Sequence, residues 1–209
     1  LNKLSSEIDA NLFITRLSGH GVPYEGTKQM QIDKIMYDVA EAIIIGERIG
    51  ENVILIGHSL GGALSMLAAD DELLSKKIDT LVLFAPGNSG ISPFAFMNTL
   101  ISSLVDRTGS LCWLIDCDPR SFMDLPEDEK WENYFANDFD TNIFYQIARI
   151  PFATDSISYD TISTSALVFY DENDRLVNAG KLKSNFEKWS AKNKVVSIET
   201  LETDRGRHM

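Results

Sequence analysis

The chain has 209 residues, of which 44% are hydrophobic and 24% are charged, and its formal net charge is −12. This size and composition predict one globular domain with a sizeable core. The acidic balance argues against nucleic acid as a partner and against docking on anionic membranes, and no apolar run reaches the ~18 residues that a membrane-spanning helix needs.

Strand-like runs alternate with helical patterns along most of the chain. Residues 11–17 predict a strand, which the turn at 18–21 ends. Apolar residues at helical spacing predict a helix over 31–49, closed by Gly50. Further strands are predicted at 53–57, 80–85, 166–170 and 195–201, and further helices at 60–74 and 179–191. Near-continuous apolar strands separated by helices predict an α/β fold, a mostly parallel sheet covered by helices on both faces.

Residues Gly57-His58-Ser59-Leu60-Gly61, followed by Gly62, match the pattern G-x-S-x-G. They lie between a predicted strand and a predicted helix, where a sharp turn lifts a serine hydroxyl above the end of the strand. The flanking glycines are expected to remove side chains that would collide with the strand and the helix. A glycine-rich loop that merely ends a buried strand is the alternative, but the context favours Ser59 as a nucleophile.

The alternation of strands and helices breaks down between residues 88 and 160. Large apolar residues are frequent there, and between Asp116 and Asp140 nine acidic residues stand against two basic ones. Because ligands bind at the strand ends of open α/β sheets, this insertion predicts a helical cap, with 1–87 and 161–209 forming the core. Ordinary packing helices with a solvated acidic face are the alternative. The apolar cap residues that are candidates for substrate contact are Phe94, Phe96, Met97, Trp113 and Phe122.

Two cysteines, Cys112 and Cys117, lie within this insertion. They have neither metal-ligand spacing nor other ligands beside them, which favours two reduced thiols over a local disulfide. The sequence therefore predicts no metal site.

A serine nucleophile needs a base, and the chain has 3 histidines. His58 adjoins Ser59, so its side chain is expected to point away from the hydroxyl. His20 lies in a glycine-flanked turn, and positioning that turn is its favoured role. His208, in the loop after the last predicted strand, is the candidate base. For the acid that orients the base, spacing alone does not choose among three carboxylates after the strand at 166–170: Asp171, Glu172 and Asp174.

Together these features resemble the α/β-hydrolase superfamily, and within it the monoacylglycerol-lipase-like esterases and compact carboxylesterases with a Gly-His-Gly-Val-Pro turn. Residues 17–23 resemble that turn, which follows the family's fourth strand, 57–62 its nucleophile elbow, and 206–209 the loop of its catalytic histidine, although Arg207 stands where the family usually has Gly. Residues 166–177 are similar to the family's acid segment, which places the acid at Asp174. The family usually has Gly at position 171, and Asp171 is expected to adopt the positive φ that this Gly would take.

The resemblance also predicts that a strand is absent. In the family, a central strand lies between the strand at 11–17 and the elbow strand, and the loop after it donates one oxyanion N–H. Residues 1–8 resemble the helix that follows this loop, and the chain ends one residue after His208. Since an unfilled central gap would leave backbone groups unpaired, the sequence is expected to be part of a longer protein.

The resemblance implies a serine hydrolase that cleaves carboxylic esters, either small acyl esters or monoacylglycerol-type lipids, through an acyl-enzyme on Ser59. His208 is the expected base, Asp174 the acid, and the backbone N–H of Leu60 one oxyanion donor, with no metal or organic cofactor. A thioesterase or an aminopeptidase with the same triad is an alternative, as is a non-catalytic binding protein on this scaffold. The expected location is cytoplasmic, and the oligomeric state is left open.

Overall fold

The computed structural model describes residues 1–21, 30–87, 142–174, 177–190 and 196–200. Its helices are α1 (Asn2–Glu7), α3 (Ile32–Ile49), α4 (Leu60–Asp70), the 3-10 helix η1 (Ser75–Lys77), α7 (Asn142–Asp155) and α8 (Ala179–Ser190). Its strands are β1 (Ile54–His58), β2 (Thr80–Phe84), β3 (Ser165–Tyr170) and β4 (Val196–Thr200). The predicted helices and strands from residue 31 onward that lie in these ranges are confirmed, except that the helix beginning at Leu60 is shorter than predicted.

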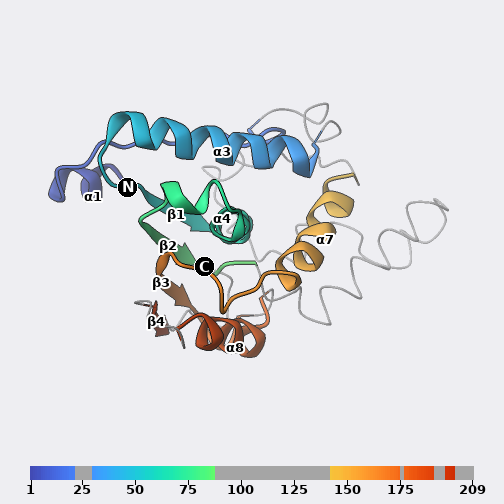
Figure 1. Cartoon of the computed structure of the whole chain (residues 1–209). Coiled ribbons are helices and arrows are strands. Elements are labelled where there is room, and N and C mark those ends of the chain that lie inside the picture. The colour runs from blue at the N-terminus through green and yellow to red at the C-terminus, as the bar shows by residue number, and fades with distance from the viewer. Residues whose placement is uncertain (22–29, 88–141, 175–176, 191–195, 201–209) are drawn as a thin grey trace, which may run out of the picture.

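The four strands form one parallel sheet in the order β1-β2-β3-β4. Figure 1 shows the strands running in this order from β1, beside α3 and α4, to β4, beside α8. Along β2 and β3 every second residue is buried and the alternate residues are half-buried, so both faces of the sheet are covered at least in part. This is the α/β arrangement that the sequence predicted, with consecutive parallel strands joined across helices.

The core lies between the sheet and its helices. From α3 it takes Ile35, Val39 and Ile43, which sit at the helical spacing that the sequence predicted. From α8 it takes Leu182, Phe186 and Trp189, and the rings of Phe186 and Trp189 stack with their centroids 5.4 Å apart. The indole N–H of Trp189 donates to the carbonyl of Thr164 at 3.0 Å, which satisfies the one polar group of this large buried side chain.

The predicted strand at residues 11–17 is not formed. This stretch pairs with no strand in the described ranges, and the side chain of Ile14 is 66% exposed. Its start is held instead by Asn11, whose amide donates to the carbonyl of Ile49 at the end of α3. Strand propensity takes effect only where a neighbouring strand offers backbone partners, and β1 is the edge of the described sheet.

The helix after the elbow is also shorter than the predicted 60–74. It ends at Asp70, because Asp71 takes an extended backbone with φ −73° and ψ 132°. The carboxylate of Asp71 then accepts the backbone N–H groups of Leu73 and Leu74, both at 2.9 Å. Such a side-chain acceptor competes with helix continuation, and these two hydrogen bonds lower the pKa of Asp71.

The end of the predicted insertion packs on the core. α7 contacts α4, Ile150 is buried, and the side-chain carbonyl of Gln146 accepts the N–H of Ile32 at 3.2 Å. The segment after α7 adds Ile157 and Tyr159 to the hydrophobic core. Residues 88–141, which hold most of the predicted cap and both cysteines, lie outside the described residues, so the division into core and cap stays a prediction.

Candidate active site

Ser59 occupies the turn between β1 and α4. Its backbone has φ 49° and ψ −112°, a conformation that is strained for a residue with a side chain. A strand followed at once by a helix forces the chain to reverse within one residue. The serine therefore stands at the carboxyl end of β1 and at the N-terminus of α4, as the sequence pattern predicted.

Three backbone hydrogen bonds hold Ser59 in this conformation. Its N–H donates to the carbonyl of Phe84 at 2.9 Å, which ties the turn to the end of β2. Its own carbonyl accepts the N–H of Ala63 at 3.2 Å, inside α4, and the N–H of Gly87 at 2.9 Å, after β2. The strain at Ser59 persists because both of its neighbouring elements fix the same peptide units.

Two of the glycines around Ser59 are required by close contacts. A Cβ on Gly57 would lie 2.5 Å from the carbonyl oxygen of Gly61, and one on Gly62 would lie 2.7 Å from Cβ of Pro86. Nothing lies within 4 Å of a Cβ built on Gly61. The expectation that the flanking glycines avoid collisions therefore holds for Gly57 and Gly62 and is wrong for Gly61, because a Cβ there would lie in open space.

Leu60, the proposed oxyanion donor, is the first residue of α4. The N–H groups of a helix's first turn have no acceptor inside the helix and carry a partial positive charge, so they suit an oxyanion. Gly87 lies over this peptide: a Cβ at that position would be 3.5 Å from the carbonyl oxygen of Ser59 and 4.0 Å from the nitrogen of Leu60. A glycine at position 87 therefore keeps side-chain atoms off the peptide that carries the candidate donor.

The candidate acids lie in a tight turn after β3. The backbone carbonyl of Asp171 accepts the N–H of Asp174 at 3.2 Å, and the Asp171 carboxylate accepts the N–H of Asn173 at 2.7 Å. The carboxylate of Asp174 accepts the N–H of Val177 at 3.0 Å. Asp171 is only 1% exposed, whereas Asp174 is half-buried. Both carboxylates are thus fixed by backbone donors, and Asp174 is the more accessible of the two.

The parallel register brings the elbow and the acid turn to one edge of the sheet. His58, Phe84 and Phe169 are partners across β1, β2 and β3, so Ser59 and the turn that begins at Asp171 both follow the carboxyl ends of these strands. The rings of Phe84 and Phe169 stack between them, with centroids 4.9 Å apart. This edge is where ligands bind in open α/β sheets.

The positive φ expected at Asp171 is absent. The described non-glycine residues with positive φ are Asp9, Ser59 and Ala85. Ala85, with φ 40°, follows β2 and donates its N–H to the carbonyl of Phe169 at 2.8 Å. Asp171 needs no such conformation, because its side chain closes the turn by accepting the N–H of Asn173. No sequence signal marked Ala85, since alanine is an ordinary residue for a strand end.

Tyr170, at the last position of β3, is a further titratable residue beside the acid turn. Burial raises the pKa of its phenol, and the carboxylates of Glu172 and Glu187 raise it further. The phenol is therefore neutral throughout the range in which a histidine base works. Its place in an apolar strand gave no reason to single it out from the sequence.

The remaining predicted residues divide into two groups. His58 is exposed at the end of β1, and His20 lies in the expected turn between Gly19 and Gly21, both of which have positive φ. The N–H of Ser18 donates to the carboxylate of Asp38, which anchors this turn on α3. The other group lies outside the described residues, and its members are His208, Phe94, Phe96, Met97, Trp113 and Phe122.

Two general findings concern the described ranges as a whole. They contain no cluster of three or more acidic, histidine or cysteine side chains with the geometry of a metal site. None of their helices combines the length and the apolar character needed to cross a membrane.

A model of the alpha/beta hydrolase family matches residues 4–209. The chain belongs to the alpha/beta hydrolase family. No curated protein matches it in sequence. Within this family, a serine at a strand-to-helix elbow and an acid after a later strand are the arrangement that its hydrolases use.

Several solved structures are similar to this alpha/beta hydrolase. The structure reported for the metagenome-derived lipolytic enzymes LipS and LipT shares 15% identity and has a TM-score of 0.64, covering 90% of this chain and 70% of its own. The monoacylglycerol lipase of Paleococcus ferrophilus shares 18% identity, with a TM-score of 0.57 and coverage of 88% and 70%. A soluble variant of the monoglyceride lipase of Saccharomyces cerevisiae, solved with a substrate analogue, shares 13% identity, with a TM-score of 0.58 and coverage of 88% and 66%. At such identities the likeness establishes the fold.

Proposed function

We propose that this alpha/beta hydrolase is a serine esterase that cleaves carboxylic esters through an acyl-enzyme on Ser59. The observation that carries the proposal is the backbone of Ser59, at φ 49°, fixed by hydrogen bonds to the end of β2 and to the segment after it. Such strain is retained where the surrounding structure over-determines it, and it clusters at functional sites. A glycine-rich loop that merely ends a strand would not require a serine to be fixed at positive φ by hydrogen bonds.

In the proposed reaction, the Ser59 hydroxyl attacks the ester carbonyl carbon while His208 takes its proton. The negative charge that develops on the carbonyl oxygen is stabilised by the N–H of Leu60 at the start of α4. His208 then protonates the leaving alcohol, and a water molecule, activated by the same base, releases the acid from Ser59. Asp174 orients the imidazole and stabilises its protonated form.

The hydrogen bonds around Ser59 also limit which other backbone N–H groups can donate to the oxyanion. The N–H of Gly87 is used by the carbonyl of Ser59, so it does not serve as the second donor. Removing one donor of an oxyanion hole costs ~10²–10³ in rate, so the N–H of Leu60 is expected to contribute strongly to turnover.

We propose small acyl esters or monoacylglycerol-type lipids as substrates. Phe94, Phe96, Met97, Trp113 and Phe122 would contact the acyl chain, because an apolar lining suits an acyl group better than a polar peptide. Two of the similar structures are named as lipases of monoacylglycerols or monoglycerides, which supports this substrate class. The cytoplasmic location expected from the sequence stays a prediction.

The test combines a covalent probe with ester turnover. A fluorophosphonate probe is expected to label the wild type and the Ser156→Ala variant but not Ser59→Ala; Ser156 is an exposed serine outside the elbow. Release of p-nitrophenol from the acetate and laurate esters is expected to follow the same pattern. Full turnover by Ser59→Ala would refute the serine mechanism. An intact wild type that neither reacts with the probe nor cleaves esters, thioesters or amides would instead indicate a binding protein.

A further inference from the structure

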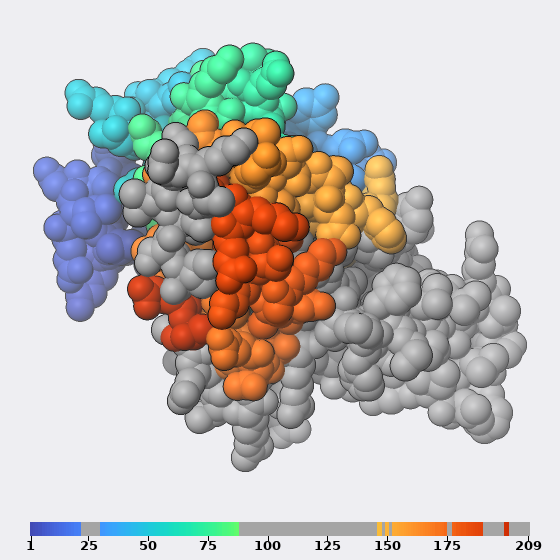
Figure 2. All heavy atoms as spheres, turned by 60° about the horizontal axis from the view of Figure 1, so that its bottom comes forward, coloured from blue at the N-terminus to red at the C-terminus, as the bar shows by residue number. Residues whose placement is uncertain are grey.

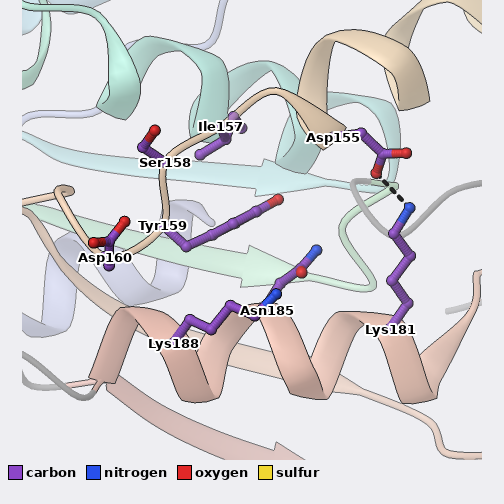
Figure 3. A pocket seen from close by; sticks show the side chains of 8 residues that line it. All are labelled: Asp155, Ile157, Ser158, Tyr159, Asp160, Lys181, Asn185 and Lys188. Carbon is purple, nitrogen blue, oxygen red and sulfur yellow. Dashed lines mark hydrogen bonds and ion pairs between the residues drawn. The ribbon is translucent and has the colours of Figure 1, made fainter.

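A pocket of about 670 Å³ lies between α8 and the segment that follows α7 (Figure 3). This volume falls within the roughly 300–1,000 Å³ of small-molecule sites. None of the residues that line it belongs to the Ser59 elbow or to the acid turn. Figure 2 shows α7 and α8 at the surface of the same face of the molecule. Neither Ser59 nor Asp174 therefore lines this pocket.

The two walls of the pocket carry opposite charges. Lys181 and Lys188 line it from α8, and Asp155 and Asp160 line it from the other side. At one end Lys181 pairs with Asp155, so these two charges neutralise each other (Figure 3). Lys188, at the other end, forms no ion pair with any residue in the described ranges. Its ammonium group is thus available to an anion.

Asn185 supplies the second polar group. It is 6% exposed, and Figure 3 shows its side chain extending from α8 toward the opposite wall. Its amide has no hydrogen-bond partner among the residues that the structure describes. The atoms of this amide are not enclosed by the protein, so they can donate to a ligand in the pocket. Because Asn185 and Lys188 are three residues apart on one helix, they lie on the same face of α8.

The rest of the pocket suits an organic group rather than a bare ion. Ile157 and Tyr159 line it with largely buried side chains. The phenol of Tyr159 already donates to the carbonyl of Thr154 at 3.3 Å, so the residue offers the pocket its ring. Asp160 on the same wall repels a doubly charged anion such as phosphate more strongly than a singly charged one. A single available cation beside one acidic neighbour favours an anion of charge one over an anion of charge two.

We propose that this pocket binds a monocarboxylic acid. One carboxylate has two oxygens, which match two donors: the ammonium of Lys188 and the amide N–H of Asn185. The alkyl or aryl part of the acid rests against Ile157 and Tyr159. Hydrogen bonds to charged donors are the stronger class, so Lys188 contributes most to the affinity, and Asn185 fixes the orientation.

Titration with hexanoate tests the proposal on the full chain. With ¹⁵N-labelled protein, the side-chain amide signals of Asn185 are expected to shift saturably, with a Kd on the order of 1 mM, as for a small ligand with one charged contact. Lys188→Gln is expected to weaken binding about tenfold. Asn185→Asp keeps the shape of the side chain but repels the ligand, and it should weaken binding by at least as much.

Lys183→Gln is the matched control, because Lys183 is exposed on α8 and does not line the pocket. It should bind hexanoate like the wild type. Equal Kd values for Lys188→Gln and Lys183→Gln would overturn the proposal, as would the absence of a saturable shift at 50 mM hexanoate (a concentration about fifty times the expected Kd). Inorganic phosphate binding as tightly as hexanoate would overturn the carboxylate assignment. Lys188 is exposed, so its variant is expected to fold, and Ser59 takes no part in any of these measurements.

Discussion

The N–H of Gly87 donates to the carbonyl oxygen of Ser59 at 2.9 Å, and this contact joins the segment after β2 to the candidate nucleophile between β1 and α4. The N–H of Ser59 in turn donates to Phe84, at the end of β2. The elbow therefore connects β1 to α4 along the chain and is also hydrogen-bonded to the end of β2 and to the segment after it. Substitutions that push β2 away from β1 are expected to disturb Ser59 without touching its hydroxyl.

The first prediction concerns the two glycines that follow Leu60. A Cβ at position 62 would lie 2.7 and 2.8 Å from Cβ and Cα of Pro86, so Gly62→Ala must displace the segment after β2. We expect it to lower the free energy of unfolding by about 1–3 kcal/mol, as overpacking does, and to reduce esterase activity. Gly61→Ala meets no atom within 4 Å and should leave the stability unchanged or slightly higher. Urea unfolding of both variants measures this difference. Equal losses of unfolding free energy in the two variants would contradict the elbow geometry.

The second prediction concerns strain at the nucleophile. Ser59→Gly and Ser59→Ala both remove the hydroxyl, but only glycine adopts a φ of 49° without a steric penalty. Ser59→Gly is therefore expected to be about 1 kcal/mol more stable than Ser59→Ala, since positive-φ strain of about 1–3 kcal/mol is relieved and part of the gain is lost to chain entropy. Thermal unfolding measures the difference. A Gly variant that is no more stable than the Ala variant would show that Ser59 is unstrained.

The third prediction separates two of the three candidate acids, Asp174 and Asp171. Asp174→Asn should lower kcat by roughly 10³–10⁴-fold with little change in KM, because an amide leaves the histidine in the wrong tautomer. Asp171→Asn keeps an oxygen that accepts the N–H of Asn173, so its kcat should stay within about threefold of the wild type. The pH dependence of kcat/KM checks both variants. A large loss in Asp171→Asn alone would move the acid role to Asp171.

Some features of this fold and of its candidate site could be predicted from the sequence, and others could not. The elbow was predictable because strand, Gly57, Ser59 and helix are contiguous, and a local pattern fixes a local turn. The features that the sequence did not predict correctly depend on contacts between distant parts of the chain. Residues 11–17 have the composition of a strand, but pairing depends on a neighbour that a local pattern does not show. The conformation at Ala85 depends on its hydrogen bond to Phe169 on β3, far away in the sequence, which no local spacing encodes.

The fourth prediction follows from the raised pKa of Tyr170. Burial is the largest cause, and Glu172 and Glu187 add to it, so the folded state binds this proton more tightly than the unfolded state. The stabilisation is complete below the ordinary tyrosine pKa of about 10 and is lost as the pH rises through the higher folded value. Tyr170→Phe removes the titrating group. Urea midpoints should therefore fall more steeply for the wild type than for Tyr170→Phe between about pH 9 and 11. Parallel curves would contradict the raised pKa.

The last prediction tests the unformed strand at 11–17 with a matched pair of substitutions. Ile14 is 66% exposed, whereas Ile35 of α3 is fully buried against the core. Ile14→Ala should change the free energy of unfolding by less than about 0.5 kcal/mol, as surface substitutions do. Ile35→Ala should cost about 2–5 kcal/mol, because it removes buried methyl groups and leaves a cavity. Urea unfolding of the same chain measures both. A loss at Ile14 close to that at Ile35 would mean that residues 11–17 pack as a buried strand in solution, and the sheet would then extend beyond β1.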